Sequence, residues 1–321
     1  MNGIKGGAVY REVSSDISQK IRNMGLLCAI LVVSIHVNWP SDGLFTVGRF
    51  MREFVQNGIA EIAVPFFFTV SGFFLAQHFD DQGWWWQETR KRIKTLAIPF
   101  MIWAIIDRFA INPFPWPLWY VRCLMLFVLT SVVFKWGVDK FGVAWLLTLF
   151  ALSLVPTYVP DVNFSGRSLR SFFVFWYSLE GAFYFSVGIL IQRIAPRMKS
   201  NGVACLCGVF GLIALVAIKI HGPDWWTPVL RACLLPCLMY CIWHFMPSVR
   251  IAKWITSCSF PIFLMHMIFV THLPCLMRSV KIDDLSQSAA VFTGSICASV
   301  GATIFLRRFL PRTASILFGG R

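Results

Sequence analysis

Charged residues are scarce in this chain, and most of those present are basic. Only 14% of the 321 residues are charged, with 15 Asp and Glu against 29 Lys and Arg. Soluble domains carry roughly 25% charged residues. Because 57% of the residues are hydrophobic and the mean hydropathy is +0.67, the composition excludes an ordinary soluble domain and predicts a protein of the lipid bilayer.

Other features are missing as well, and each absence excludes a class of protein. The first twenty residues hold no apolar stretch before a small-residue cleavage site, so we expect no signal peptide. The ten cysteines lack the spacing of a zinc or redox motif, so we expect no metal site and no disulfides. No clear internal repeat supports an inverted-repeat transporter, and no stretch is long enough for a separate soluble domain.

Ten apolar segments fit the length of about 20 residues that a membrane-spanning helix needs. The predicted spans are residues 23–40, 59–77, 95–112, 117–136, 142–158, 171–192, 202–220, 228–246, 255–274 and 287–306. With a cytoplasmic N-terminus, most of the 29 Lys and Arg lie on the cytoplasmic side, as the positive-inside rule requires. We therefore predict an all-α polytopic bundle of about ten transmembrane helices with both termini cytoplasmic.

Three parts of the chain follow from these spans. We expect a cytoplasmic N-terminal segment at 1–22, one membrane domain at 23–306 and a cytoplasmic basic tail at 307–321. The net charge of +14 is then mainly a topology signal, so the lipid bilayer and not nucleic acid is the expected partner. Nothing in the sequence indicates an oligomeric state.

A histidine lies inside the first predicted span. His36 follows Arg22 by 14 residues, about 21 Å along a helix, which places it in the outer half of the bilayer. Ionisable groups at such depths usually face a bundle interior or a wet cavity and mark a functional site. The alternative is an interfacial histidine whose ring reaches water. His266 follows Lys253 by 13 residues in the ninth span, so the two histidines share a depth and are placed to meet.

An acidic residue lies at a comparable depth. Glu180 is ten residues inward from Arg170 in the sixth span. A buried carboxylate beside a histidine holds one tautomer and stabilises the imidazolium, which favours a role for Glu180 at His36. The alternative is that Glu180 forms a structural ion pair with Arg122 or Arg170.

A run of positive charge precedes the third span. Arg90, Lys91, Arg92 and Lys94 place four cationic groups within five residues at the cytoplasmic face. Such a cluster suits the phosphates of a ligand. The alternative is a topology signal that also contacts anionic lipid.

Six segments in chain order carry a family resemblance. They are AILVVSIH (Ala29–His36), VPFFFTVSGFFLA (Val64–Ala76), RKRIKTLAIPFMIW (Arg90–Trp103), PLWYVRCLM (Pro117–Met125), FWYSLEGAFYFSVG (Phe175–Gly188) and SFPIFLMH (Ser259–His266). Together they resemble the acyltransferase-3 family of integral membrane acyltransferases over most of the chain. The family is typically ten-helical. Its members transfer acetyl or other acyl groups from cytoplasmic coenzyme A thioesters to sugars of surface polysaccharides, lipopolysaccharide or glycolipids.

The resemblance also implies roles for particular residues. The histidine that ends the first helix is regarded as catalytic in the family, which corresponds to His36, and the basic run at 90–94 is associated with acyl-CoA. The chain departs from the family pattern at two places. Gly25 stands eleven residues before His36, where members often carry an arginine, and Arg22 lies almost one turn earlier. Lys91 and Lys94 stand where many members have two arginines three apart.

We therefore expect an O-acyltransferase of the bacterial inner membrane, with acyl-CoA, most simply acetyl-CoA, as co-substrate and no permanently bound cofactor. His36 takes the proton of a sugar hydroxyl, or forms an acyl-histidine as the variant mechanism. His266 or Glu180 orients His36, Arg122 stabilises the oxyanion or binds the acceptor, and Arg22 assists the donor. The alternatives are a proton-coupled transporter in which His and Glu relay protons, and a scaffold or sensor that tolerates loss of His36.

Overall fold

Helices make up nearly all of the described chain. The computed structural model describes residues 14–41, 46–110, 118–158, 163–164, 167–168, 177–194, 201–221, 227–277 and 282–320, so residues 1–13 and Arg170 lie outside the described residues. The helices are α1 (Ser15–His36), α2 (Val47–Phe50), the π-helix η1 (Met51–Gln56), the 3-10 helix η2 (Ile59–Ile62), α3 (Ala63–Ala76), α4 (Trp84–Arg92), the π-helix η3 (Ile93–Ala97), α5 (Ile98–Ala110), α6 (Trp119–Leu129), α7 (Ser131–Phe141), α8 (Val143–Tyr158), α10 (Leu179–Ile194), α11 (Asn201–His221), α12 (Thr227–Phe245), α13 (Lys253–Thr256), α14 (Ser259–Leu276), α15 (Asp284–Phe309) and α16 (Pro311–Leu317). One short antiparallel pair, β1 (Asn163–Phe164) with β2 (Arg167–Ser168), joins α8 to α10.

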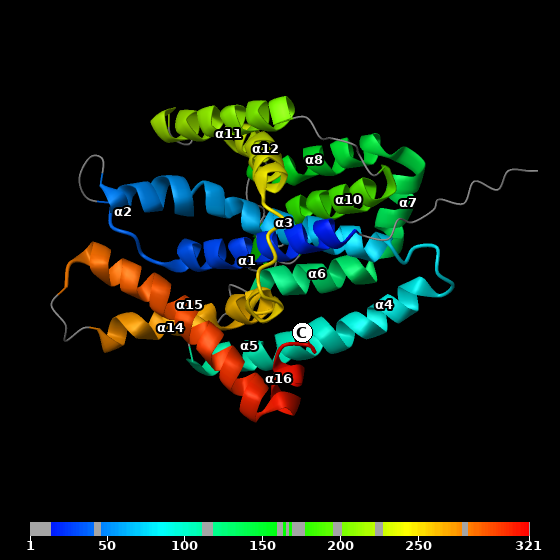
Figure 1. Ribbon diagram of the computed structural model, residues 1–321. Helices are drawn as coiled ribbons and strands as arrows, with labels where there is room; N and C mark the ends of the chain where they lie inside the picture. Colours follow the sequence, from blue (N-terminus) through cyan, green and yellow to red (C-terminus); the bar gives the residue numbers. More distant parts are fainter. Residues whose placement is uncertain are drawn as a thin grey trace, which may run out of the picture.

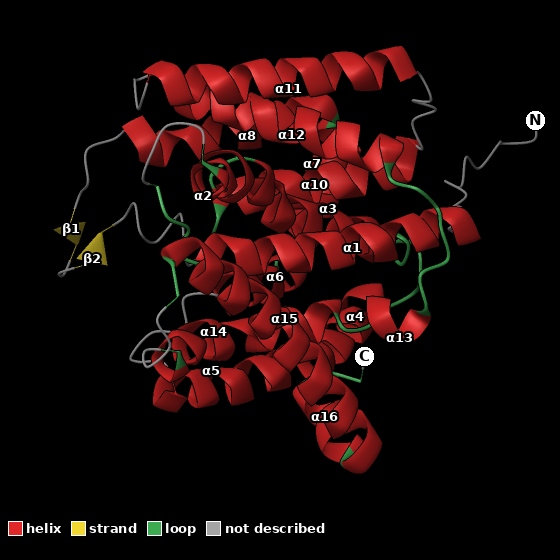
Figure 2. Ribbon diagram, turned by 60° about the vertical axis from the view of Figure 1, so that its left-hand side comes forward, coloured by secondary structure: helices red, strands yellow, loops and turns green. Residues whose placement is uncertain are grey.

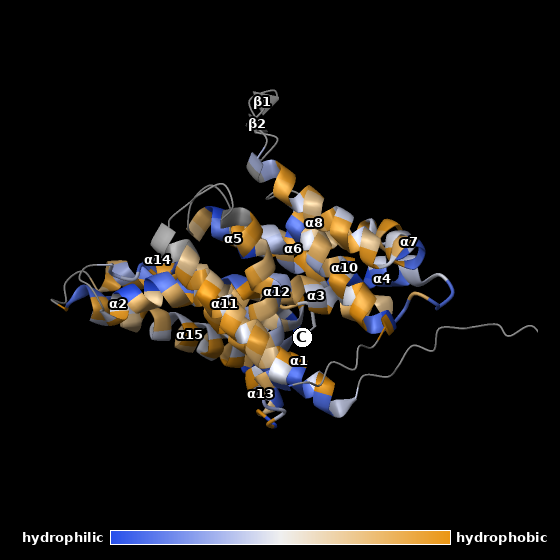
Figure 3. Cartoon of the chain, turned by 90° about the horizontal axis from the view of Figure 1, so that it is seen from above, coloured by the Kyte–Doolittle hydropathy of each residue, from blue (hydrophilic) through white to orange (hydrophobic). Residues whose placement is uncertain are grey.

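The helices form one bundle with α1 and α3 in its middle. α11 packs on α12 at one edge, and α14, α15 and α5 lie on the opposite side (Figure 1, Figure 2). Hydrophobic residues predominate in most of the helices (Figure 3), and many of them are exposed, among them Leu206 and Ile213 of α11 and Phe305 of α15. An apolar outer surface of this extent suits a bundle surrounded by lipid.

Each of the ten predicted spans coincides with a helix or a run of consecutive helices in the described part of the chain. Among the described residues, four helical runs are long and apolar enough to cross a membrane, namely Ser15–His36, Val47–Ala76, Ser259–Leu276 and Asp284–Phe309. A fifth is added if α6 and α7, which meet at 66°, count as one broken span. The all-helical, multi-spanning architecture is confirmed, while the count of ten and the sides of the termini stay predictions.

Two glycines bring α3 and α10 into backbone contact. A Cβ atom at Gly72 of α3 would overlap the carbonyl of Phe185, and one at Gly188 of α10 would overlap the carbonyl of Thr69. Small residues at helix contacts let backbones approach closely where lipid gives no hydrophobic driving force. The pair therefore fixes α10 against the central helix α3.

The helical run Val47–Ala76, which comprises α2, η1, η2 and α3, is interrupted near the end of α1. The break falls at Gly58, where a Cβ would meet the Phe54 carbonyl at 2.5 Å and the Leu215 side chain at 2.8 Å. Just before it, the Gln56 side-chain amide donates to the carbonyl of Ile35 at 2.7 Å. Single π-turns inside helices recur at functional sites. Here η1 is fastened to the last turn of α1, one residue from His36.

The predicted tail at 307–321 is folded onto the bundle as far as the described chain extends. α16 packs on α5, and the Trp103 indole donates to the Leu317 carbonyl at 3.0 Å. Gly319 has a φ of +66°, and a Cβ there would overlap the Thr95 carbonyl. A residue with a side chain would be strained there by both its backbone and its neighbour. The described part of the 307–321 segment therefore packs against the bundle, while its cytoplasmic location stays a prediction.

Candidate active site

His36 and His266 lie side by side inside the bundle. Their ring centroids are 5.2 Å apart and the rings are inclined by 40°. His36 is the last residue of α1, which ends as the chain turns extended at Val37. His266 lies in the middle of α14 and is fully buried. The contact predicted from the matched depth of the two histidines is therefore present.

Backbone carbonyls fix the ring of His266. Its Nδ1 lies 2.8 Å from the Phe263 carbonyl and 3.2 Å from the Ile262 carbonyl. Carbonyl oxygens only accept, so Nδ1 carries the proton and Nε2 presents a lone pair. Nε2 is buried and has no hydrogen-bond partner among the described residues. The fold therefore holds a hydrogen-bond acceptor beside the ring of His36.

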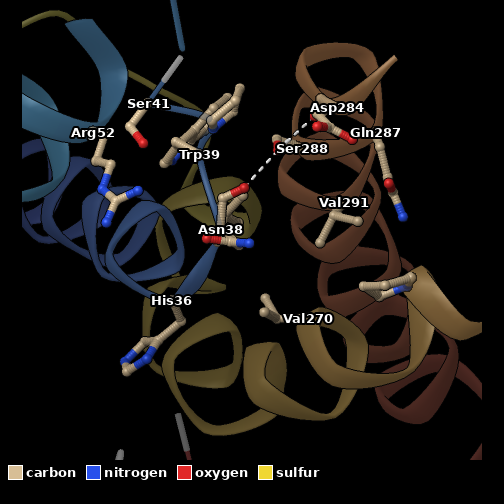
Figure 4. A pocket seen from close by; sticks show the side chains of 13 residues that line it. His36, Asn38, Trp39, Ser41, Arg52, Val270, Asp284, Gln287, Ser288 and Val291 are labelled. Carbon is tan, nitrogen blue, oxygen red and sulfur yellow. Dashed lines mark hydrogen bonds between the residues drawn. The ribbon is translucent and has the colours of Figure 1, made fainter. Parts of the chain in front are cut away.

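One side of the histidine pair opens into a polar cavity of about 420 Å³, which we name the His36 cavity. Its walls include His36 and the chain that follows it, Arg52 of η1, and Asp284, Gln287 and Ser288 of α15. Figure 4 shows Arg52 and the α15 side chains on opposite sides, with His36 at the other end of the space. Hydroxyl, amide, carboxylate and guanidinium groups of this kind suit a ligand rich in hydroxyls.

A hydrogen bond closes one wall of this cavity. The Ser288 hydroxyl donates to the Asn38 carbonyl at 2.7 Å and so ties α15 to the chain that leaves α1. Nearby, Trp39 is only 4% exposed, and its indole donates to the Ser34 carbonyl at 3.3 Å. The extended segment after His36 is thus fixed on both sides, which holds the imidazole at the cavity end.

A second cavity of about 240 Å³, here named the Arg92 cavity, lies between α3, α6 and α14. Apolar rings dominate its walls, with Phe67 and Phe74 of α3, Tyr120 of α6 and Phe263 of α14, and Arg92 lies at its edge. A narrow apolar space with one cationic group suits a chain-like ligand that carries negative charge at one end.

Helix α14 lines both cavities, with His266 between them. Ser259, Phe260 and Phe263 border the Arg92 cavity, while Val270 and Pro274 border the His36 cavity. Phe263 and Val270 are about 10 Å apart along a helix axis, at 1.5 Å per residue. The ring centroid of Phe263 lies 6.1 Å from that of His266. The histidine pair therefore stands where the two cavities approach each other.

The predicted basic run is held by a buried acid. Glu88 is 5% exposed, and its carboxylate lies 3.0 Å from the Lys91 ammonium and 3.5 Å from Nε of Arg92. Arg90 lies over the Trp86 ring at 5.4 Å, and Lys94 is exposed. Of the five predicted donor-binding residues, which include Arg22, Arg92 is the one that lines the Arg92 cavity in the described chain.

Glu180 belongs to a different cluster. Its charged neighbours are Arg231 of α12 and Glu61 of η2, and the Arg231 guanidinium lies 2.5 Å from the Glu61 carboxylate. Arg122 is half-buried on α6 and borders neither cavity. Arg22 is exposed on α1, where its guanidinium donates to the side chains of Ser18 and Gln19. The structure thus joins the two histidines, while Glu180, Arg122 and Arg22 line neither of the two cavities.

Sequence reasoning missed several residues of the site. Arg52, Gln56 and the polar start of α15 were not singled out, because each lies at a helix end where polar residues are common. Glu88 carried a usable signal, since an acid three residues before Lys91 pairs with it on a helix. No group of three or more His, Cys, Asp or Glu in the described ranges is arranged to hold a metal ion.

Comparisons with known proteins agree with this architecture. A family model described as an acyltransferase domain, Acyl_transf_3, matches residues 23–106 and 108–308. The succinoglycan biosynthesis protein ExoH of Rhizobium meliloti (strain 1021) is 23% identical over 255 residues. That match covers 66% of this chain and 65% of ExoH, so the chain spans just under two thirds of this relative. No solved structure matches. The apolar helices and the family match together make this a multi-pass membrane protein.

Proposed function

The chain belongs to the acyltransferase-3 family, and on that premise we propose that it transfers an acyl group from acyl-CoA to a hydroxyl of a surface polysaccharide or glycolipid. One observation carries the proposal: the His36–His266 pair stands between an apolar cavity edged by Arg92 and a polar cavity edged by hydroxyl-binding groups. The printed name of ExoH, a succinoglycan biosynthesis protein, supports a polysaccharide acceptor.

The proposed topology gives the two substrates separate entrances. Ten spans with both termini in the cytoplasm of a bacterial cell put the basic run at 90–94 on the inner face and His36 near the outer face. The donor then enters from the cytoplasm through the Arg92 cavity. The acceptor enters the His36 cavity from the opposite side of the inner membrane.

Arg92 is the proposed anchor of the donor phosphates. A guanidinium presents a planar fork that matches phosphate oxygens, and Glu88 fixes it from behind. The exposed Arg90, Lys91 and Lys94 add positive charge around the entrance. The apolar walls accommodate the pantetheine arm and a short acyl chain, of which acetyl is the simplest.

Acyl transfer at the histidine pair proceeds by general base catalysis. His36 takes the proton of the acceptor hydroxyl as the hydroxyl oxygen attacks the thioester carbonyl. A carbon–oxygen bond forms, the carbon–sulfur bond breaks, and the proton passes from His36 to the departing thiolate of coenzyme A. His266 is proposed as a positioning residue, because its unpaired Nε2 lone pair lies beside the His36 ring and would accept a hydrogen bond from the His36 N–H as the imidazolium forms.

Acyl transfer by the purified protein tests the proposal directly. Nanodiscs containing wild-type protein or His36→Ala are incubated with radiolabelled acetyl-CoA and lipid-linked or soluble glycans. Label that moves to glycan only with wild type supports acyl transfer with His36 as base. Wild type that neither binds nor consumes acyl-CoA, yet moves a solute across proteoliposomes, contradicts the proposal and favours the transporter.

A further inference from the structure

Arg52 places an uncommitted positive charge in the wall of the His36 cavity. It belongs to η1, and it lies across the cavity from the α15 side chains (Figure 4). Its guanidinium makes no hydrogen bond, ion pair or ring contact with any described residue. The guanidinium of the other cavity differs, since Arg92 faces the Glu88 carboxylate. A guanidinium with five donors and no partner in the described part of the chain is available to a ligand.

The backbone holds Arg52 in place. η1 is a π-turn whose last residue, Gln56, donates to the carbonyl of Ile35. Arg52 and His36 are therefore carried by two segments that are bonded to each other within one residue of the histidine. A ligand group held by Arg52 has a fixed relation to the imidazole, which is what a substrate-orienting contact requires.

The opposite wall carries the complementary chemistry. Asp284, Gln287 and Ser288 present carboxylate, amide and hydroxyl groups on the first turns of α15. Asp284 and Arg52 form no ion pair, although both line the same cavity. The carboxylate repels a second negative charge and accepts hydrogen bonds from neutral hydroxyls. A ligand with one anionic side and one hydroxyl-rich side is therefore oriented uniquely.

We infer that the acceptor carries an anionic group, a carboxylate or phosphate, which binds Arg52 while its hydroxyls face α15 and His36. This inference rests on the proposed function and extends it, because it specifies that the acceptor is negatively charged. A neutral glycan leaves the guanidinium without a partner and binds in several orientations. Bidentate pairing of guanidinium with carboxylate or phosphate supplies both affinity and direction.

Binding, measured apart from turnover, tests the inference. An acidic oligosaccharide containing glucuronic acid and its carboxyl-reduced, neutral counterpart are titrated into protein in phosphatidylcholine nanodiscs. Wild type is compared with Arg52→Gln, and Arg49→Gln serves as the matched control, because Arg49 is exposed one turn away and does not line the cavity. We expect Arg52→Gln to weaken binding of the acidic sugar about tenfold, the loss of one charge-assisted hydrogen bond.

The same titration identifies other outcomes. Binding of the neutral sugar is expected to be equal in wild type, Arg52→Gln and Arg49→Gln. Equal affinity of wild type for the acidic and neutral sugars overturns the inference, as does an equal loss in both arginine variants. In phosphatidylglycerol nanodiscs, loss of the Arg52 effect would mean that lipid phosphate is the partner and would also overturn it. Absence of acyl transfer with intact, Arg52-dependent acidic binding would instead contradict the proposed function alone.

Discussion

The imidazole of His266 is anchored by the Phe263 carbonyl at 2.8 Å, and its other nitrogen is left beside His36, with ring centroids 5.2 Å apart. The buried partner is thus fixed in orientation, and the half-buried His36 faces the cavity. This asymmetry separates the roles of two otherwise identical side chains. In the proposed mechanism the half-buried His36 ring reacts, and the fixed His266 ring sets its tautomer.

Replacement of His266 is expected to lower kcat with little effect on KM. His266→Leu removes the lone pair beside His36 and should reduce kcat of acyl transfer about 100-fold, the lower range for loss of assisted proton transfer. His266→Gln retains an acceptor oxygen and should restore part of that loss. His272→Gln on the same helix is the control. Equal rates for the Leu and Gln variants would contradict the acceptor role of His266, and their folded fraction is checked by size-exclusion chromatography.

Arg92 and Lys94 should differ in their effect on the donor. Arg92→Gln removes the cation that lines the Arg92 cavity, so the KM for acyl-CoA should rise about tenfold, as for one charge-assisted contact. Lys94→Gln removes the same charge from an exposed position and should change KM much less. Steady-state kinetics at two salt concentrations measure both. If the two variants change the KM equally, the basic run attracts the donor only through its summed positive charge, and Arg92 makes no specific contact with it.

Glu180 should contribute to the stability of the fold and not to catalysis by the histidine pair. Its charged neighbours are Arg231 and Glu61, so Glu180→Gln should lower the Tm and leave the pH dependence of kcat unchanged. Combining it with Arg231→Gln should give less than the sum of the two single effects, because both belong to one cluster. A shifted pH profile in Glu180→Gln would assign this residue to His36 after all.

The glycine contact between α3 and α10 should not tolerate a side chain. Gly188→Leu forces a side chain against the Thr69 carbonyl and should destabilise the protein by about 1–3 kcal/mol. Gly301→Leu on α15 is the matched control, since no heavy atom lies within 4 Å of its added Cβ. Thermal unfolding in detergent compares the two. Equal Tm values would show that the two helices separate without cost.

The depth of a residue along the membrane normal could be predicted from the sequence. The direction in which its side chain points around the helix axis could not. Flanking charges such as Arg22 and Lys253 set the heights of His36 and His266, so their meeting was predicted correctly. Glu180 has a similar height, yet it lies beside Arg231 on α12. Because these helices are apolar on every face, periodicity does not tell which face meets which neighbour.

The sequence patterns also did not predict the breaks in the helices. The second predicted span begins at residue 59, so the sequence patterns indicated neither the helical run Val47–Ala76 nor the π-turn within it. Arg52 of this π-turn lines the His36 cavity. The roles of Gly72 and Gly188 could not be predicted either. Nothing in the sequence sets them apart from the other glycines, and their importance follows from the contact between the backbones of α3 and α10.

The contact between Gly319 and Thr95 sets an order for biogenesis. It joins positions more than two hundred residues apart, and Leu96, next to Thr95, lines the Arg92 cavity. At a synthesis rate of about 5–20 residues per second, roughly 10–45 s separate the emergence of the two segments. Throughout that interval this flank of the bundle is open to lipid or to the insertion machinery. The wall of the Arg92 cavity that contains Leu96 therefore gains its α16 neighbours only after α15 has been synthesised.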